Sequence, residues 1–304
     1  AWLANILAPW LPVMAAFWLG AGLTFLLGLV FMLRRGGLAA LRGPYHLHIG
    51  AALAFALLLY LFIAIGRGMA ISDDFQNLPL AAMLAVGDFP LHFPLDPAVV
   101  YPYHYFNLLI GAQFMRMFNL FTWTGVDVAR GLTFTLGIFL AALWGQRLTR
   151  STLAGCLNGL MFALAGGARW LMLLLPVGLL TGLSAHITMI GSGKASAPDL
   201  ISALSGTWAT AGAGPYAFPF AFVNGFLPPM ILNYHSGGGA VGILIIWLLL
   251  LTFNRQRGLA AWVLQAVLLA ASALAGETGF VLFFLAVGIL LVYDLIKNRR
   301  LLPS

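Results

Sequence analysis

The uncharged stretch LHIGAALAFALLLYLFIAIG, residues 47–66, decides the fold class of this chain. A helix of that length extends for about 30 Å, which matches the thickness of the hydrocarbon core of a bilayer. In hydrocarbon every backbone polar group needs an internal partner, and a helix supplies one within a single segment. The stretch therefore predicts a membrane-spanning α-helix.

The rest of the chain has the same character. Across 304 residues the hydrophobic fraction is 62% and the charged fraction 8%, whereas soluble domains carry about 25% charged residues. No water-soluble fold could bury that much apolar surface. We therefore expect an all-α fold, a polytopic transmembrane helical bundle that forms a single membrane domain over residues 1–304.

Seven apolar stretches are predicted to span the membrane. Two long external regions, 67–128 and 181–239, are expected between them. The segment Tyr103–Phe121 is apolar but carries Asn107, Gln113 and Arg116, so we expect it to lie in the interface. The segment Trp170–Leu180, broken by Pro176, is expected to be interfacial or re-entrant. The predicted spans are Leu11–Leu33, Leu47–Gly66, Ala129–Gln146, Thr152–Ala165, Ala240–Phe253, Gly258–Ala275 and Phe280–Ile296.

The basic residues predict the orientation of the bundle. Basic residues concentrate in cytoplasmic loops, and with this set of spans ten of the fifteen basic residues fall on one side, together with a single acid, Asp294. The other side receives five basic and seven acidic residues. We expect a multi-pass protein of the cell membrane, with cytoplasmic arginine clusters and external long loops. The clusters are short and scattered, which does not indicate nucleic-acid binding.

The most informative polar motif, SDDFQNLP at residues 72–79, directly follows the second predicted span. It places Asp73 and Asp74 at the outer membrane surface. Leu80, Met83, Leu84 and Val86 follow at helical spacing, so the acids are expected to lie at the start of an interfacial helix, whose dipole favours anions. The alternative role is an N-cap, for which one Asp suffices.

Other ligand-capable side chains are spread over the external segments. His104 lies between tyrosines, and Arg116 lies on the predicted interfacial helix. Arg169 and His235 belong to the region around the second long loop. Glu277 is the one acid between the last two spans, where a carboxylate at membrane depth indicates function. The alternative role is interfacial anchoring for the segment around His104 and snorkelling for Arg169. For Glu277 the alternative is a position in water at the turn. No pair has the spacing of a zinc site, and the sequence demands no cofactor, although a divalent metal stays open.

Some residues are expected to serve packing only. Asp127 and Arg130 lie three apart and are expected to form a local ion pair. The glycine pairs Gly155/Gly159 and Gly178/Gly182 are spaced for close helix contact, although a chain with 35 glycines also gives such pairs by chance. The single Cys156 is expected to be a buried core thiol.

Five features, taken in chain order, resemble the GT-C glycosyltransferases. These polytopic enzymes, which include the protein mannosyltransferase and aminoarabinose transferase types, use lipid-linked sugars. The resemblance covers roughly residues 64–167. It is carried by Asp73-Asp74 before an amphipathic helix, Gly87-Asp88-Phe89-Pro90, Tyr103-His104-Tyr105, the interfacial helix to Phe121, and Gly125-Val126-Asp127-Val128-Ala129-Arg130 leading into a span.

The resemblance implies specific roles. In that superfamily an Asp of the first external loop is the general base, so Asp73 or Asp74 is the expected base. His104, Arg116 or Arg169 would neutralise the departing lipid phosphate. Glu277 and His235 are expected to converge on the same site as substrate-binding groups.

The expected function is therefore transfer of a sugar from a polyprenyl-phosphate carrier to an acceptor at the non-cytoplasmic face. The expected partners are membrane lipids and the lipid-linked sugar. Asn77 stands where related chains often have His, and 304 residues is short for the superfamily. We thus also expect either a fragment of such an enzyme or a member that kept the scaffold and lost the chemistry. The alternative function is a non-catalytic membrane subunit of a larger complex.

Overall fold

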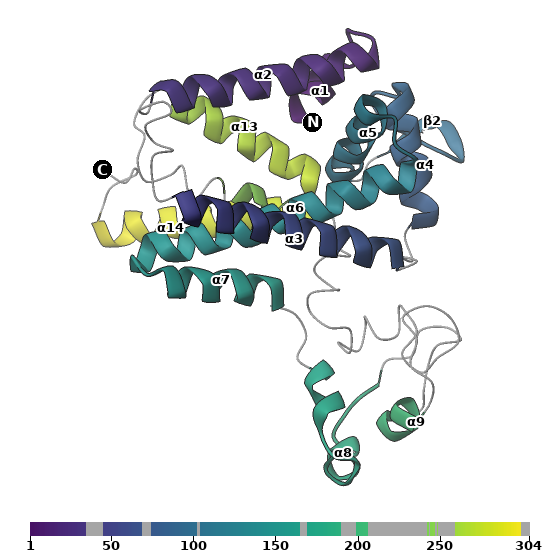
Figure 1. Ribbon diagram of the computed structural model, residues 1–304, viewed down its shortest axis with the longest axis vertical. Coiled ribbons are helices and arrows are strands. Elements are labelled where there is room, and N and C mark those ends of the chain that lie inside the picture. Colours follow the sequence, from purple (N-terminus) through teal and green to yellow (C-terminus); the bar gives the residue numbers. More distant parts are fainter. Residues whose placement is uncertain are drawn as a thin grey trace.

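The computed structural model describes residues 1–34, 45–68, 74–101, 104–164, 169–189, 199–205, 242, 244–246, 248 and 259–298, and this part of the chain is mostly helical (Figure 1). Within it, four helices are long and apolar enough to cross a bilayer. These are α2 (Val13–Arg34), α3 (Tyr45–Gly68), α6 (Thr122–Thr149) and α14 (Glu277–Asn298). The prediction of a mostly helical chain with membrane-spanning character is confirmed.

The other predicted spans are represented less completely. α7 (Thr152–Leu164) has 13 residues and α13 (Leu259–Ala275) has 17. Both are therefore shorter than the roughly 20 residues that a helix needs to span the hydrocarbon core of a bilayer. Most of the predicted span Ala240–Phe253 lies outside the described residues.

α6 is the central helix of the described bundle. In its apolar 18-residue window 56% of the residues are buried, against 17% or less in the corresponding windows of α2, α3 and α14. α3 packs against it in antiparallel direction, since Phe55 stacks edge-on with Phe139 and Phe62 with Phe134. The exposed faces of α2, α3 and α14 carry large apolar side chains, which suit a hydrocarbon environment.

Glycines let α7 approach α6 closely. A Cβ on Gly155 would lie 2.7 Å from the carbonyl oxygen of Ala142, and one on Gly159 would lie 3.1 Å from that of Ile138. Asn158 Nδ2 donates to the Ala141 carbonyl at 2.6 Å. The predicted role of the first glycine pair in close packing is confirmed. Gly178 and Gly182 of α8 (Val177–Ser184) have no neighbour within 4 Å of an added Cβ, so the expectation of a contact at the second pair finds no support in the described residues.

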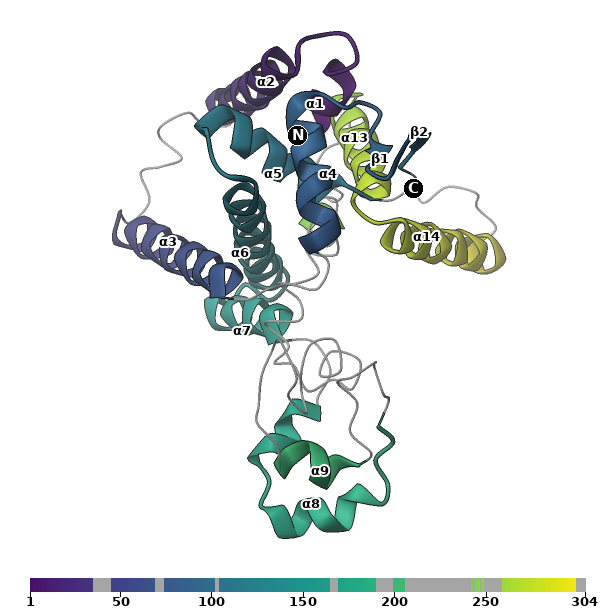
Figure 2. The ribbon, with the colours of Figure 1, turned by 90° about the vertical axis from the view of Figure 1, so that its right-hand side faces the viewer.

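A small layer covers one end of the long helices (Figure 2). It consists of α4 (Asp74–Val86), α5 (Phe106–Phe118) and the antiparallel strands β1 (His92–Phe93) and β2 (Asp96–Val100). The hairpin departs from the all-α expectation. With 13 residues, about 20 Å of helix, α5 is too short to span, in line with the expectation for this segment. The N-terminal α1 (Trp2–Leu7) packs beside α2.

Within the described part of the chain, three of the four long helices end in basic residues on the same side of the bundle, whereas α3 carries Arg67 in its last turn on the other side. In Figure 1 the C-terminal ends of α2, α6 and α14 lie on the left, whereas α4, α5 and β2 lie on the right. α2 ends at Arg34, and the last turns of α6 and α14 carry Arg147 and Lys297. The basic ends of α2, α6 and α14 therefore lie opposite the α4–α5 layer.

The segment after α7 lies apart from this bundle. A short 3-10 helix, η2 (Arg169–Leu174), is followed by α8, and the break falls at Pro176, which caps α8. Figures 1 and 2 both show α8 and α9 (Leu200–Ser205) well away from the long helices. Cys156 of α7 is exposed, so the expectation of a buried core thiol was wrong.

Candidate functional site

The predicted acidic motif leads into a helix as expected. Asp74 is the first residue of α4, while Asp73 lies outside the described residues. Leu80 and Leu84 are fully buried in the core beneath α4. Val86 is 76% exposed, so its predicted place on the apolar face was wrong. Gly87, at φ +103°, ends the helix in a conformation that side chains with a Cβ rarely adopt.

The segment after α4 is held by polar contacts. The Asp88 carboxylate accepts the His92 backbone N–H at 2.9 Å and lies 2.6 Å from His92 Nδ1. Gln76 Nε2, in the first turn of α4, donates to the Tyr101 hydroxyl at 2.9 Å. These contacts fix the hairpin beside the beginning of α4. Tyr101, the residue held by Gln76, precedes His104 by three positions.

Two of the predicted site residues meet across the sequence. His104 Nδ1 lies 3.0 Å from Glu277 Oε2. Glu277 opens α14, and α13, which precedes it, packs against α5. Side-chain exposures of 27% for His104 and 56% for Glu277 leave both groups open to a ligand. This contact brings the last two helices to the end of the bundle where α4 begins.

The environment of Glu277 favours its charged form. The pKa of this carboxyl lies below its ordinary value, first because the carboxylate accepts its own backbone N–H at the start of α14, and further because of His104. A helix N-terminus favours an anion in the same sense. Glu277 is therefore a carboxylate at neutral pH, able to accept hydrogen bonds from hydroxyl groups.

A second charged cluster connects α3 and α6. Arg67 Nε lies 3.3 Å from Asp127 Oδ2, and Arg67 Nη2 donates to Thr124 Oγ1 at 2.6 Å. The sequence predicted a local pair of Asp127 with Arg130 and did not name Arg67 as a partner. The packing of α3 on α6 explains the contact. Gly131 lets Ile63 of α3 approach α6 closely, and Arg67, one turn after Ile63 on α3, therefore lies beside Asp127. Arg130 is 3% exposed on the same helix.

The remaining predicted residues are placed differently. Arg116 is exposed in the last turn of α5, in the same layer as α4. Arg169 opens η2, which leads into α8, and its Nη1 donates to the Thr188 carbonyl at 3.0 Å. That segment lies away from His104 and Glu277. His235 lies outside the described residues.

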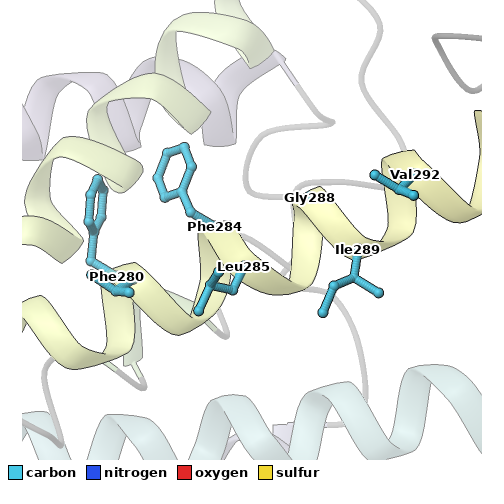
Figure 3. A pocket seen from close by; sticks show the side chains of 7 residues that line it. Phe280, Phe284, Leu285, Gly288, Ile289 and Val292 are labelled. Atoms are coloured by element: carbon cyan, nitrogen blue, oxygen red, sulfur yellow. The ribbon is translucent and has the colours of Figure 1, made fainter.

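An apolar groove of about 560 Å³ begins one turn after Glu277. Its lining residues project from successive turns of α14 around Gly288 (Figure 3). The described residues that line it are all apolar. The lining residues are Phe280, Val281, Phe284, Leu285, Gly288, Ile289 and Val292.

Among the described residues, no three His, Cys, Asp or Glu side chains are close enough together to hold a metal ion. Comparison with protein-family models, with curated proteins and with solved structures gives no match for this chain. The GT-C resemblance therefore stays a prediction from the quoted sequence motifs.

Proposed function

We propose that this chain is a membrane glycosyltransferase of GT-C type, or a part of one, that moves a sugar from a polyprenyl-phosphate carrier to an acceptor at the non-cytoplasmic face. The observation that carries the proposal is the contact between His104 and Glu277. Both were candidate site residues from sequence, and the fold joins them at the end of the bundle where α4 begins at Asp74.

The proposed topology has seven spans with the α4–α5 layer outside. Its support is the charge sorting of the helix ends, because the C-terminal ends of α2, α6 and α14 carry basic residues and lie opposite that layer. The positive-inside rule then assigns the basic ends to the cytoplasm. The long loops and the sugar-transfer site would both be external.

The proposed chemistry assigns the base to Asp73 or Asp74. The acceptor hydroxyl gives its proton to the carboxylate as its oxygen attacks the anomeric carbon of the sugar. The bond between that carbon and the lipid phosphate breaks, and the phosphate leaves with the electron pair. His104 or Arg116 would stabilise the leaving phosphate, and Glu277 would accept a sugar hydroxyl.

The groove on α14 suits the lipid part of such a substrate. A polyprenyl chain is wholly apolar. A groove lined by apolar side chains is therefore as suitable an environment for it as the hydrocarbon of the bilayer. The groove starts three residues from Glu277. A chain lying along α14 would therefore place its head group beside the His104–Glu277 pair.

The test is sugar transfer from a polyprenyl-phosphate sugar by the purified, full chain. Replacing both Asp73→Asn and Asp74→Asn should lower the rate by about 10²-fold or more, as removal of a general base does. Asp96→Asn is the matched control, since this acid is exposed in the same external segment on β2. It should leave the rate unchanged. Equal rates for the double variant and wild type would rule out the proposed base.

A second candidate function is a non-catalytic subunit of a membrane complex. The observation in its favour is α14, whose apolar window has no buried residue among those described. Such a helix could pack against another membrane protein. Two results together would favour this function. α14 would cross-link to a co-purifying membrane protein, and the complex would transfer no sugar, whether it contains the wild-type chain or the variant with Asp73→Asn and Asp74→Asn.

A further inference from the structure

We propose that Arg67 binds the phosphate monoester of a lipid head group, and that Asp127 and Thr124 hold the Arg67 guanidinium in the orientation that binds it. The site deepens the proposed function, on which the identity of the lipid rests. The sequence placed Arg67 outside the membrane but gave it no role. The structure adds a geometry that a simple surface arginine lacks.

The guanidinium of Arg67 is fixed along one edge only. Its Nε and Nη2 are engaged by Asp127 and Thr124, and within the described part of the chain Nη1 has no partner. The Arg67 side chain is 50% exposed, whereas that of Asp127 is 8% exposed. The carboxylate is thus the buried anchor, and the open edge of the guanidinium carries donors that suit a phosphate oxygen.

The depth of the cluster matches that of lipid head groups. Arg67 is the last residue of the apolar window of α3, and Thr124 and Asp127 lie in the first two turns of the 28-residue α6. A helix of that length extends for about 42 Å, more than the roughly 30 Å of hydrocarbon. Its first turns therefore reach the layer where lipid phosphates lie.

The local charge also favours an anion. Asp127 offsets one positive charge, but Arg130 lies one turn along α6 and is almost fully buried. Among the described members of this cluster, Arg67, Arg130 and Asp127 together carry one net positive charge. A guanidinium already held in place loses less conformational freedom on binding than a mobile one, so the anchor at Asp127 adds to the affinity.

The cluster lies close to the proposed base along the chain. Asp74 follows Arg67 by seven residues, which limits their Cα separation to about 25 Å even for an extended chain. α4, which begins at Asp74, also contacts α6. A lipid phosphate on Arg67 would therefore bring its sugar toward the acids that follow α3.

The experiment measures binding of three probes to the purified, full chain in detergent: a polyprenyl monophosphate, the neutral polyprenol, and inorganic phosphate. Arg67→Gln should weaken binding of the lipid phosphate about tenfold or more, as loss of a charge-assisted contact does, and leave polyprenol unchanged. Arg67→Lys should retain part of the affinity. Arg147→Gln, at the opposite end of α6, is the matched control and should have no effect.

Asp127→Asn separates this role from a purely structural one, because it breaks the same ion pair but removes a negative charge. It should weaken lipid-phosphate binding less than Arg67→Gln does, because the anchor is lost but the guanidinium that contacts the phosphate remains. Equal weakening by Arg67→Gln and Asp127→Asn, or equal loss of polyprenol and lipid phosphate, would overturn the proposal. Loss of inorganic phosphate alone would assign the site to free phosphate and overturn the lipid assignment.

Binding and transfer fail independently. Arg67-dependent binding of the lipid phosphate without any sugar transfer would overturn the proposed function and keep the Arg67 site. Transfer that needs Asp73 and Asp74 but tolerates Arg67→Gln would keep the function and overturn the site.

Discussion

His104 and Glu277 lie 173 residues apart in the sequence, and His104 Nδ1 is 3.0 Å from Glu277 Oε2. The contact joins the segment before α5 to the first residue of α14. Both side chains are partly exposed, so their contact orients the two side chains more than it stabilises the fold. A carboxylate paired in this way is oriented before any substrate binds.

A double-mutant cycle should measure this coupling. His104→Gln and Glu277→Gln each replace one partner of the contact, and we expect an interaction free energy of about 0.2–1 kcal/mol, the range for exposed polar pairs of this kind. The measurement is the free energy of unfolding of wild type, both single variants and the double variant in detergent. Strictly additive single effects would show that the two side chains do not interact.

The same pair should respond to acid. The pKa of Glu277 is lowered in the folded chain, so the carboxylate contributes stability that is fully present above the ordinary value of 4.5 and is lost as the pH falls through the folded value. The thermal unfolding midpoint of wild type should exceed that of Glu277→Gln by a constant amount above pH 4.5, and the difference should shrink below pH 4.5 and disappear once the pH is below the folded-state pKa. His104→Gln should keep part of this dependence, since the largest cause is the backbone N–H of Glu277. A lead that persists at low pH would contradict the assignment.

The packing of α7 on α6 gives a matched pair of variants. Gly155→Ala and Gly178→Ala make the same change, and each gains about 1 kcal/mol of helix propensity. At Gly155 the new methyl would lie 2.7 Å from the Ala142 carbonyl, whereas at Gly178 it meets nothing within 4 Å. Because overpacking costs about 1–3 kcal/mol, Gly155→Ala should unfold at a lower temperature than Gly178→Ala. The same midpoint for both would show that α6 and α7 are not in close contact.

The core beneath α4 offers another comparison. Leu84 is fully buried and Val86 is 76% exposed, two residues apart on one helix. Leu84→Ala should cost about 2–5 kcal/mol of unfolding free energy, and Val86→Ala less than about 0.5 kcal/mol. Chemical denaturation of the two variants checks the face of α4. Similar losses at both positions would mean that the helix is turned differently.

Much of this architecture follows from local sequence. The apolar stretches predict α2, α3, α6 and α14 because about 20 uncharged residues have only one stable conformation in hydrocarbon. The start of α4 after the acidic motif, the short α5 and the contact of Gly155 with α6 were predicted correctly for the same kind of reason, a helical spacing or a small side chain.

What local patterns missed depends on contacts between distant segments. The Asp127 side chain meets Arg67, 60 positions earlier, because Gly131 lets α3 pack against α6. The two-stranded hairpin between α4 and α5 depends on Asp88 and His92 and has no strong strand pattern. Likewise, spacing alone could not pair His104 with Glu277 or show that Cys156 is exposed.

The account depends most on the side of the membrane that the α4–α5 layer faces, which a labelling experiment decides. In a Cys156→Ser background, Leu95→Cys in the hairpin turn and Leu148→Cys near the end of α6 create single thiols at positions 87% and 65% exposed. A membrane-impermeant maleimide applied to intact cells should label Leu95→Cys at once and Leu148→Cys only after permeabilisation. Labelling of Leu148→Cys alone from outside would contradict the account.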